Sequence, residues 1–229
     1  MRKSLFIALV IITGMAAATA QDTINRYDEA GRRHGLWIKK YSNGNIRYRG
    51  TFSHGKETGK FFFYSPSNPD HPSAVKDYTA GDGRVKVSFY RDDGTLESEG
   101  FFIGKKRTGT WKYYFKDGKT LLSTEEYRDG KRNGVSYTYY VNGKTAKEAH
   151  YKDGKLHGTV KMYSRDGVLL ELMTYRDGIA EGPAEIYDEN GNLYAKGQYS
   201  AGLKTGEWEF HIDGKVIRTT HPEWIHRKD

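Results

Sequence analysis

Residues 158–182 read Gly-Thr-Val-Lys-Met-Tyr-Ser-Arg-Asp-Gly-Val-Leu-Leu-Glu-Leu-Met-Thr-Tyr-Arg-Asp-Gly-Ile-Ala-Glu-Gly, and this unit predicts how most of the chain folds. Polar and apolar residues alternate over residues 159–162, which is the period of a β-strand. Asp166-Gly167 then predicts a two-residue type I′ hairpin turn, because both residues tolerate the positive φ that this turn needs. A second strand follows to Tyr175, and a longer connecting turn over residues 177–182 leads into the next unit.

The glycine that opens this unit returns about every 24 residues along the chain, a period typical of repeat arrays. In such arrays each unit packs mainly on its two neighbours, so the fold is expected to be elongated. The opening glycines are Gly35, Gly59, Gly83, Gly109, Gly134, Gly158, Gly182 and Gly206.

Two further series run in step with the opening glycines. Asn-Gly or Asp-Gly dipeptides predict one hairpin turn per unit, with the glycines Gly44, Gly94, Gly118, Gly143, Gly167, Gly191 and Gly214. An aromatic residue ends most second strands, namely Phe52, Phe102, Tyr127, Tyr151, Tyr175 and Tyr199. We expect these rings to form a ladder on one face of the sheet and to fix the strand register.

A third series lies two residues after the opening glycine, where the chain mostly places a bulky apolar side chain. Its members are Trp37, Phe61, Val85, Trp111, Val160 and Trp208. Ser136 and Ala184 interrupt this series.

One unit, residues 59–82, departs from the pattern. Pro66, Pro69 and Pro72 are incompatible with a two-residue turn inside a hydrogen-bonded ladder, so a longer loop is expected. An irregular loop on a regular scaffold is a candidate protein-binding element, and its alternative is a tolerated insertion. The candidate loop residues are Pro66, Asn68, Pro69, His71 and Pro72.

These patterns predict an all-β fold: an elongated, single-layer antiparallel β-meander of about seven to eight tandem hairpins. About 14–16 strands at ~4.8 Å each make a sheet about 70 Å long. We divide the chain into a signal peptide (1–20), a lead-in (21–30), the repeat array (31–217) and a charged tail (218–229).

The N-terminus reads as a secretory signal peptide. A basic start precedes an apolar run from Leu5 to Met15, and Ala18-Thr19-Ala20 resembles a cleavage site. The chain contains no cysteine, which excludes disulfides and thiol chemistry. We therefore expect an exported protein, periplasmic or secreted, that is cleaved after about Ala20.

The motif Tyr127-Arg-Asp-Gly-Lys-Arg-Asn-Gly134, echoed over residues 151–158, resembles the MORN repeat and more specifically its bacterial variant. Lys119, Lys144 and Lys215, each directly after a hairpin-turn glycine, are also typical of that family. The resemblance extends over residues 31–216. It implies a single sheet of hairpins used for binding rather than catalysis, and some bacterial relatives are described as antitoxin-like.

Charge is unevenly placed. The chain has a formal net charge of +8, and the surplus of Lys and Arg lies in the connecting turns, whereas the hairpin turns are close to neutral. A basic edge of this kind is a candidate surface for anionic lipid or an envelope polymer, and solubilising turn charge is its alternative. The candidate residues are Arg32, Arg33, Lys105, Lys106, Arg107, Arg128, Lys131, Arg132 and Lys155.

No motif in the chain indicates an enzyme. The eight histidines lack metal-ligand spacing, the glycines have turn spacing rather than that of a phosphate-binding loop, and no nucleic-acid module is present. We expect no catalytic residue, no metal, no cofactor and no nucleic-acid partner. The favoured function is that of an exported scaffold that binds another protein; the alternatives are peripheral binding to an anionic membrane or envelope polymer, and an antitoxin or immunity role.

Overall fold

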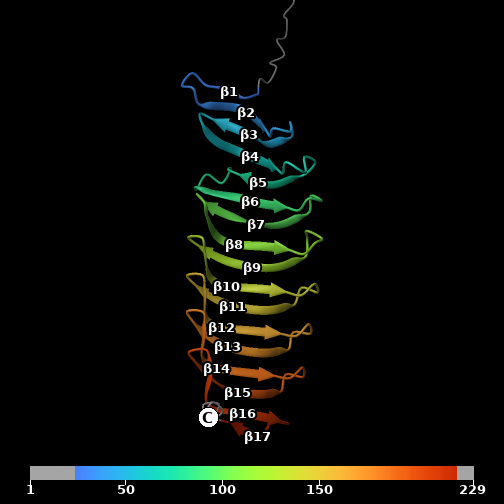
Figure 1. Cartoon of the computed structure of the whole chain (residues 1–229), viewed down its shortest axis with the longest axis vertical. Helices are drawn as coiled ribbons and strands as arrows, with labels where there is room; N and C mark the ends of the chain where they lie inside the picture. Colours follow the sequence, from blue (N-terminus) through green and yellow to red (C-terminus); the bar gives the residue numbers. More distant parts are fainter. Residues whose placement is uncertain (1–23, 221–229) are drawn as a thin grey trace, which may run out of the picture.

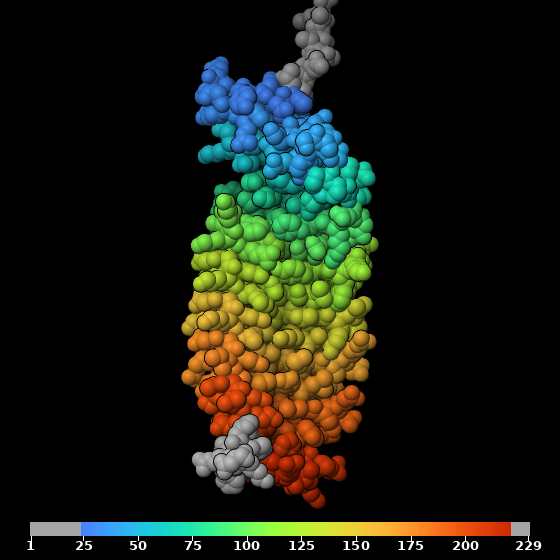
Figure 2. Space-filling view, in the orientation of Figure 1, coloured from blue at the N-terminus to red at the C-terminus, as the bar shows by residue number. Residues whose placement is uncertain are grey.

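The computed structural model describes residues 24–220, which form one open antiparallel sheet in which consecutive strands pair from β1 to β17 (Figure 1). The predicted all-β, single-layer meander of tandem hairpins is confirmed, and the described part of the chain has no helix. Eight hairpins, β2–β3 to β16–β17, stack into an elongated body (Figure 2), and β1 from the lead-in adds a short edge strand. The predicted signal peptide and most of the tail lie outside the described residues.

The strands are β1 (Arg26–Tyr27), β2 (Arg33–Lys40), β3 (Ile46–Ser53), β4 (Lys56–Tyr64), β5 (Pro72–Asp77), β6 (Arg84–Tyr90), β7 (Leu96–Ile103), β8 (Lys106–Tyr114), β9 (Leu121–Arg128), β10 (Lys131–Tyr139), β11 (Thr145–Lys152), β12 (Lys155–Tyr163), β13 (Leu169–Arg176), β14 (Ile179–Tyr187), β15 (Leu193–Ser200), β16 (Leu203–Ile212) and β17 (Lys215–Thr220).

The predicted geometry of the hairpin turns, which form the right-hand edge in Figure 1, is wrong for six of the seven. In the β12–β13 turn only Gly167 has positive φ, and the amide of Gly167 donates to the carbonyl of Ser164 while the amide of Ser164 donates to that of Val168. This is a three-residue loop, a type I turn followed by a left-handed glycine. Only Asp213 and Gly214 both have positive φ, as a type I′ turn requires.

The connecting turns, on the left-hand edge of Figure 1, are the tight ones, so the prediction of longer turns there is also wrong. Asp177 and Gly178 have φ values of 52° and 92°, and the flanking residues Arg176 and Ile179 pair directly. Both kinds of turn contain Asp-Gly, and the dipeptide alone does not fix the loop length. The pairs with this type I′ geometry are His54-Gly55, Asp129-Gly130, Asp153-Gly154, Asp177-Gly178 and Ala201-Gly202.

Six of the eight opening glycines lie in β-bulges inside the strands rather than in turns, namely Gly59, Gly109, Gly134, Gly158, Gly182 and Gly206. Gly35 lies in β2 without a bulge, and Gly83 lies just before β6. Ala149 pairs with Val160, but Tyr151 pairs with Leu156, so residues 157–159 of β12 face the single residue His150. Gly158, at the centre of the bulge, has φ of 102°, a conformation that favours glycine. In these six repeats the opening glycine therefore marks a bulge, which bends the strand near its start.

The core lies on one face of the sheet, which we call the aromatic face. Trp111 is fully buried, and its ring packs edge-on against Phe102 and Tyr127, with ring centroids 5.2 and 6.2 Å away. Phe61 packs in the same way on Phe52, and Trp208 on Tyr199. The aromatic ladder therefore interleaves with the bulky residues that follow the bulges, and both sequence series belong to one core.

Candidate functional site

Three of the hairpin turns make the same side-chain hydrogen bond to the next repeat. A side chain at the first position of one turn donates to a backbone carbonyl 23 residues later, just before the next turn. Tyr41 reaches the carbonyl of Tyr64 at 2.9 Å, and Tyr140 reaches that of Tyr163 at 2.7 Å. Arg91 makes the same contact with Tyr114 at 2.8 Å. These bonds close the gaps between neighbouring turns along this edge.

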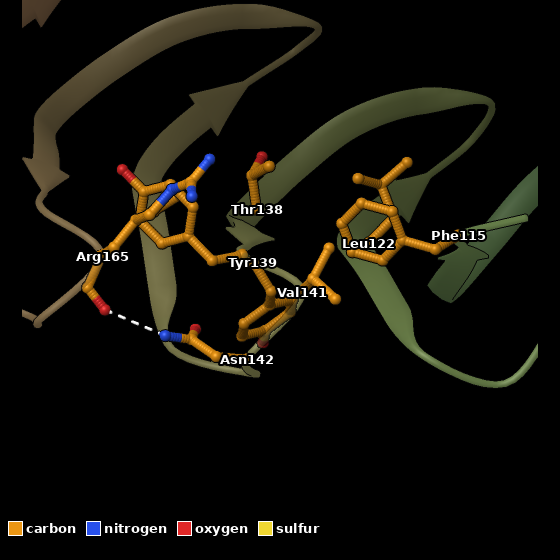
Figure 3. A pocket seen from close by; sticks show the side chains of 9 residues that line it. Phe115, Leu122, Thr138, Tyr139, Val141, Asn142 and Arg165 are labelled. Atoms are coloured by element: carbon orange, nitrogen blue, oxygen red, sulfur yellow. Dashed lines mark hydrogen bonds between the residues drawn. The ribbon is translucent and has the colours of Figure 1, made fainter. Parts of the chain in front are cut away.

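Phe115, which begins another turn, has no hydroxyl to donate, and at the corresponding positions Ser164 and Asp188 accept hydrogen bonds within their own turns instead. The loop at Phe115 is also one residue longer, since the amide of Phe115 donates to the carbonyl of Thr120, whereas the equivalent bond in the next turn joins Tyr140 to Lys144. A groove of about 610 Å³ lies between these two turns (Figure 3). It is lined by Phe115, Leu122, Thr138, Tyr139, Tyr140, Val141, Asn142, Ala146 and Arg165.

The groove is an apolar interruption of a polar edge. The side chain of Val141 is 72% exposed, whereas the equivalent position of other hairpin turns holds Ser42, Asp92, Lys116, Arg165 or Glu189. The side-chain amide of Asn142 donates to the carbonyl of Arg165 at 3.0 Å (Figure 3). This bond holds Arg165 in place at the side of the groove away from Phe115. The Arg165 guanidinium lies over the Tyr140 ring, 5.9 Å from its centroid, and places positive charge at the rim. Sequence reasoning missed this site, although Val141 and Phe115 each depart visibly from the repeat pattern.

On the opposite edge the connecting turns are stacked by backbone hydrogen bonds. The amide of Gly130 donates to the carbonyl of Arg107 at 2.9 Å, and the amides of Gly154 and Gly178 make the same bond in the next two repeats. This stacking places the residues that leave the turns in one column. Lys106, Lys131 and Lys155 occupy that column and are exposed.

The basic residues predicted for this edge fall into two groups. Arg33, Arg107 and Arg132 fold back onto the aromatic face, with guanidinium carbons 4.0, 4.2 and 4.3 Å from the ring centroids of Phe52, Trp111 and Tyr151. Such cation–π contacts hold the charge against the core. The exposed group is Arg32, Lys105, Lys106, Arg128, Lys131 and Lys155. Six of the nine basic residues predicted for this edge are therefore exposed to solvent, and the other three pack on the core.

The Pro-rich loop between β4 and β5 takes the place of a hairpin turn. The carbonyl of Pro66 accepts hydrogen bonds from the side chains of Asn43 and Asn45, and Asn68 donates to the carbonyl of Asp92 at 2.6 Å. These contacts tie the loop to the hairpin turns on both sides. Of the other predicted loop residues, Pro69 and His71 are exposed and Pro72 begins β5.

Two histidines lie in contact, although their spacing in the sequence did not indicate a pair. His34 and His54 lie with ring centroids 4.8 Å apart, and Asp28 Oδ2 is 2.7 Å from His54 Nδ1. Potential metal-ligand atoms of these three residues lie within 4.8 Å of one another. However, the Arg32 guanidinium contacts both Asp28 Oδ2 at 2.9 Å and His54 Nδ1 at 3.1 Å, where it opposes a cation.

The Asp28 carboxylate has a structural role in this cluster. Its Oδ1 accepts the amides of Ala30 and Arg32, which closes the turn before β2. The backbone hydrogen bond from Arg32, assisted by His54, holds the pKa of Asp28 well below its usual range. The cluster is thus explained by turn capping.

Within residues 24–220, no helix is long and apolar enough to cross a membrane. A comparison with curated proteins finds no match. Among solved structures, a chain in the crystal structure of TcdB2-TccC3-TEV is 12% identical over 82% of this chain, with a TM-score of 0.23. This chain spans 13% of the length of that one, and a likeness at this TM-score supports no argument about fold or function.

A family model described as MORN repeat variant matches four segments, residues 33–54, 132–153, 156–177 and 180–201. Each segment contains a hairpin turn and ends at the first residue of the connecting turn that follows. The resemblance seen in the sequence is confirmed: these four segments are MORN repeats of the variant type.

Proposed function

We propose that this repeat array is a non-enzymatic scaffold that binds another protein through the groove between the hairpin turns at Phe115 and Tyr140. The observation that carries the proposal is the apolar wall formed by exposed Val141 and half-buried Leu122 and Phe115, where other hairpin turns carry polar side chains at the position of Val141. Contiguous apolar surface that remains exposed on a monomer is characteristic of interaction sites. The MORN repeat family supports a scaffold role in general terms.

The dimensions and charge of the groove favour a particular kind of partner. Its volume of about 610 Å³ is in the range of ligand-binding clefts and accommodates one or two apolar side chains. Burying one valine- or leucine-sized side chain contributes about 1.5–3 kcal/mol. Because Arg165 lies at the rim, the partner segment should carry an acidic residue beside its apolar anchor.

The proposal is tested by panning a displayed peptide library on the full chain and measuring the selected peptides by calorimetry. We expect enrichment of peptides with an apolar residue next to an acidic one, and Val141→Lys should weaken their binding at least tenfold. Leu203→Lys is the matched control, because Leu203 is 69% exposed but lies on the opposite edge. Equal loss of binding in both variants, or no loss in either, would refute the groove as the binding surface.

A second candidate function, binding to an anionic surface, is favoured by the exposed column of Lys106, Lys131 and Lys155 on the stacked connecting turns. A basic residue near an anionic membrane contributes about 1 kcal/mol. We expect Lys106→Glu, Lys131→Glu and Lys155→Glu together to abolish flotation with phosphatidylglycerol vesicles. Arg107 and Arg132 are left intact, because they pack on the core. Absence of flotation by the wild-type protein at low salt would exclude this function.

We further propose that the scaffold acts outside the cytoplasm, on the basis of the signal-peptide pattern in residues 1–20. Expression of the full chain in its native cell should yield a mature protein that begins at Gln21. N-terminal sequencing checks this expectation, and a protein that retains Met1 or Arg2 at its N-terminus would contradict it.

A further inference from the structure

A polar hollow opens on the aromatic face where the core series is interrupted. Other repeats place Phe61, Trp111 or Trp208 at this position after the bulge, but the repeat of β10 places Ser136. The smaller side chain leaves a cavity of about 200 Å³ between β9, β10 and β11. The neighbouring core position, Ala149, is also small and does not fill it.

The hydroxyl of Ser136 is buried in the wall of the hollow. Ser136 is 9% exposed, its Oγ is buried, and this atom has no hydrogen-bond partner within residues 24–220. A buried hydroxyl without a partner is uncommon in native structures because its desolvation is not compensated. A ligand oxygen in the hollow would supply the missing acceptor.

The charged side chains around the hollow are Glu125, Arg132 and Lys147. Glu125 is already engaged, because its Oε2 accepts from the Tyr127 hydroxyl at 2.7 Å and its Oε1 lies 3.4 Å from an Arg132 nitrogen. Arg132 is held in place by stacking on Tyr151. Lys147 lines the hollow and forms no ion pair with any described residue. Two cations and one carboxylate leave a net positive site.

We propose that this hollow binds a carboxylate group, supplied by an acidic side chain of the bound partner or by a small carboxylic acid. Lys147 and the Ser136 hydroxyl would donate to the carboxylate, and hydrogen bonds of this kind are shorter and stronger than neutral ones. A monoanion suits the site better than a phosphate dianion, because the Glu125 carboxylate in the wall repels the second charge.

The partner-derived form of this inference rests on the proposed function. Thr138 lines both the hollow and the apolar groove at the hairpin turns, so the two sites are adjacent. A segment that seats an apolar side chain against Val141 can therefore present an acidic side chain to Ser136. The two sites together specify an apolar-and-acidic motif.

The direct test is an NMR titration of the full chain with glutarate and, separately, with its neutral analogue glutaramide. We expect saturable shifts of the Ser136 amide with glutarate and at least tenfold weaker binding of glutaramide. Lys147→Met should weaken glutarate binding at least tenfold, and Ser136→Val should abolish it. Val should fit, because Val160 occupies the equivalent place beside the same Ala149. Lys161→Met is the control, because Lys161 forms an ion pair with Glu148 and neither residue lines the hollow.

A second arm separates the two sources of the carboxylate and the two proposals. Capped peptides with leucine and either glutamate or glutamine are titrated into wild type, Val141→Lys and Lys147→Met. If the carboxylate comes from a partner side chain, the glutamate peptide should bind at least tenfold more tightly than the glutamine peptide, and both variants should weaken the binding of the glutamate peptide. If glutarate binds and the glutamate peptide shows no such preference, the site belongs to a small acid. Unsaturable glutarate shifts, or shifts that Lys147→Met leaves unchanged, overturn the carboxylate site. If Val141→Lys still weakens the leucine peptides in that case, the proposed function stands without it.

Discussion

The indole of Trp111 occupies the space in which a side chain on Gly100 would begin. A Cβ on Gly100 would lie 2.4 Å from the indole ring, closer than any real contact, and Gly100 itself lies in β7 without positive φ. The same relationship joins Gly50 to Phe61 and Gly197 to Trp208. Each of these glycines is needed because a side chain at its position would collide with an aromatic ring, and not because of its backbone conformation.

Gly100→Ala should therefore destabilise the protein by about 1–3 kcal/mol, the usual cost of overpacking a core. The added methyl group must displace the Trp111 ring, which is fully buried. The change in the free energy of unfolding is measured by urea denaturation.

A double-mutant cycle with Trp111→Val identifies the cause. Once the indole is gone, Gly100→Ala should have little effect, because Ala149 faces Val160 in the same arrangement elsewhere in the sheet. Additive effects of the two substitutions would show that Gly100 is needed for another reason.

Asp129 tests the corrected geometry of the connecting turns. It has φ of 52°, a left-handed conformation that Asn tolerates and β-branched residues do not. Asp129→Val should cost about 1–2 kcal/mol, whereas Asp129→Asn should change the stability by less than about 0.5 kcal/mol. Similar urea midpoints for the two variants would contradict the type I′ assignment.

Arg107 tests the division of the basic edge. Its guanidinium stacks on Trp111 and donates to the hydroxyls of Tyr113 and Tyr127 at 2.7 and 3.1 Å. Arg107→Lys should cost about 1–2 kcal/mol in thermal or urea denaturation, because an ammonium cannot reproduce a planar, forked contact. Lys105→Gln, at an exposed neighbouring position, should be nearly neutral. If Arg107→Lys leaves the stability unchanged, Arg107 belongs with the solvent-exposed basic residues.

Tyr114 predicts a pH dependence at the alkaline end. Burial, together with donation to Glu99 Oε1 at 2.9 Å, raises the pKa of Tyr114 from 10.0 to about 12. A folded-state pKa above the unfolded value means that the stabilisation is complete below pH 10 and is lost as the pH rises towards 12. The free-energy difference between wild type and Tyr114→Phe should shrink over this interval. A difference that stays constant up to pH 12 would show that the phenol is not linked to folding.

Ser136→Val should stabilise the isolated protein by about 1 kcal/mol, because it replaces a buried hydroxyl without a partner by an apolar group. Thermal unfolding measures the effect, and Ser123→Val, at the rim of the same hollow, is the comparison. Destabilisation by Ser136→Val would indicate that the hydroxyl is hydrogen-bonded in solution.

By itself the sequence determined the repeat architecture, because glycine spacing, strand-period alternation and aromatic positions all repeat with one period. It also contained the two departures that define the candidate sites, Ser136 in the core series and Phe115 in the turn series. Each departure is a local property, visible by comparison of one repeat with the next.

Only the tertiary structure decided which turns are tight, because Asp-Gly is compatible with both loop lengths and the register of the paired strands selects between them. It alone showed that Arg107 and Arg132 lie against the aromatic face, since a cation two residues from a turn can point to either side of a bulged strand. The hollow at Ser136 and the groove at Val141 likewise depend on what neighbouring repeats leave unfilled, which is a property of packing between strands rather than of any one segment.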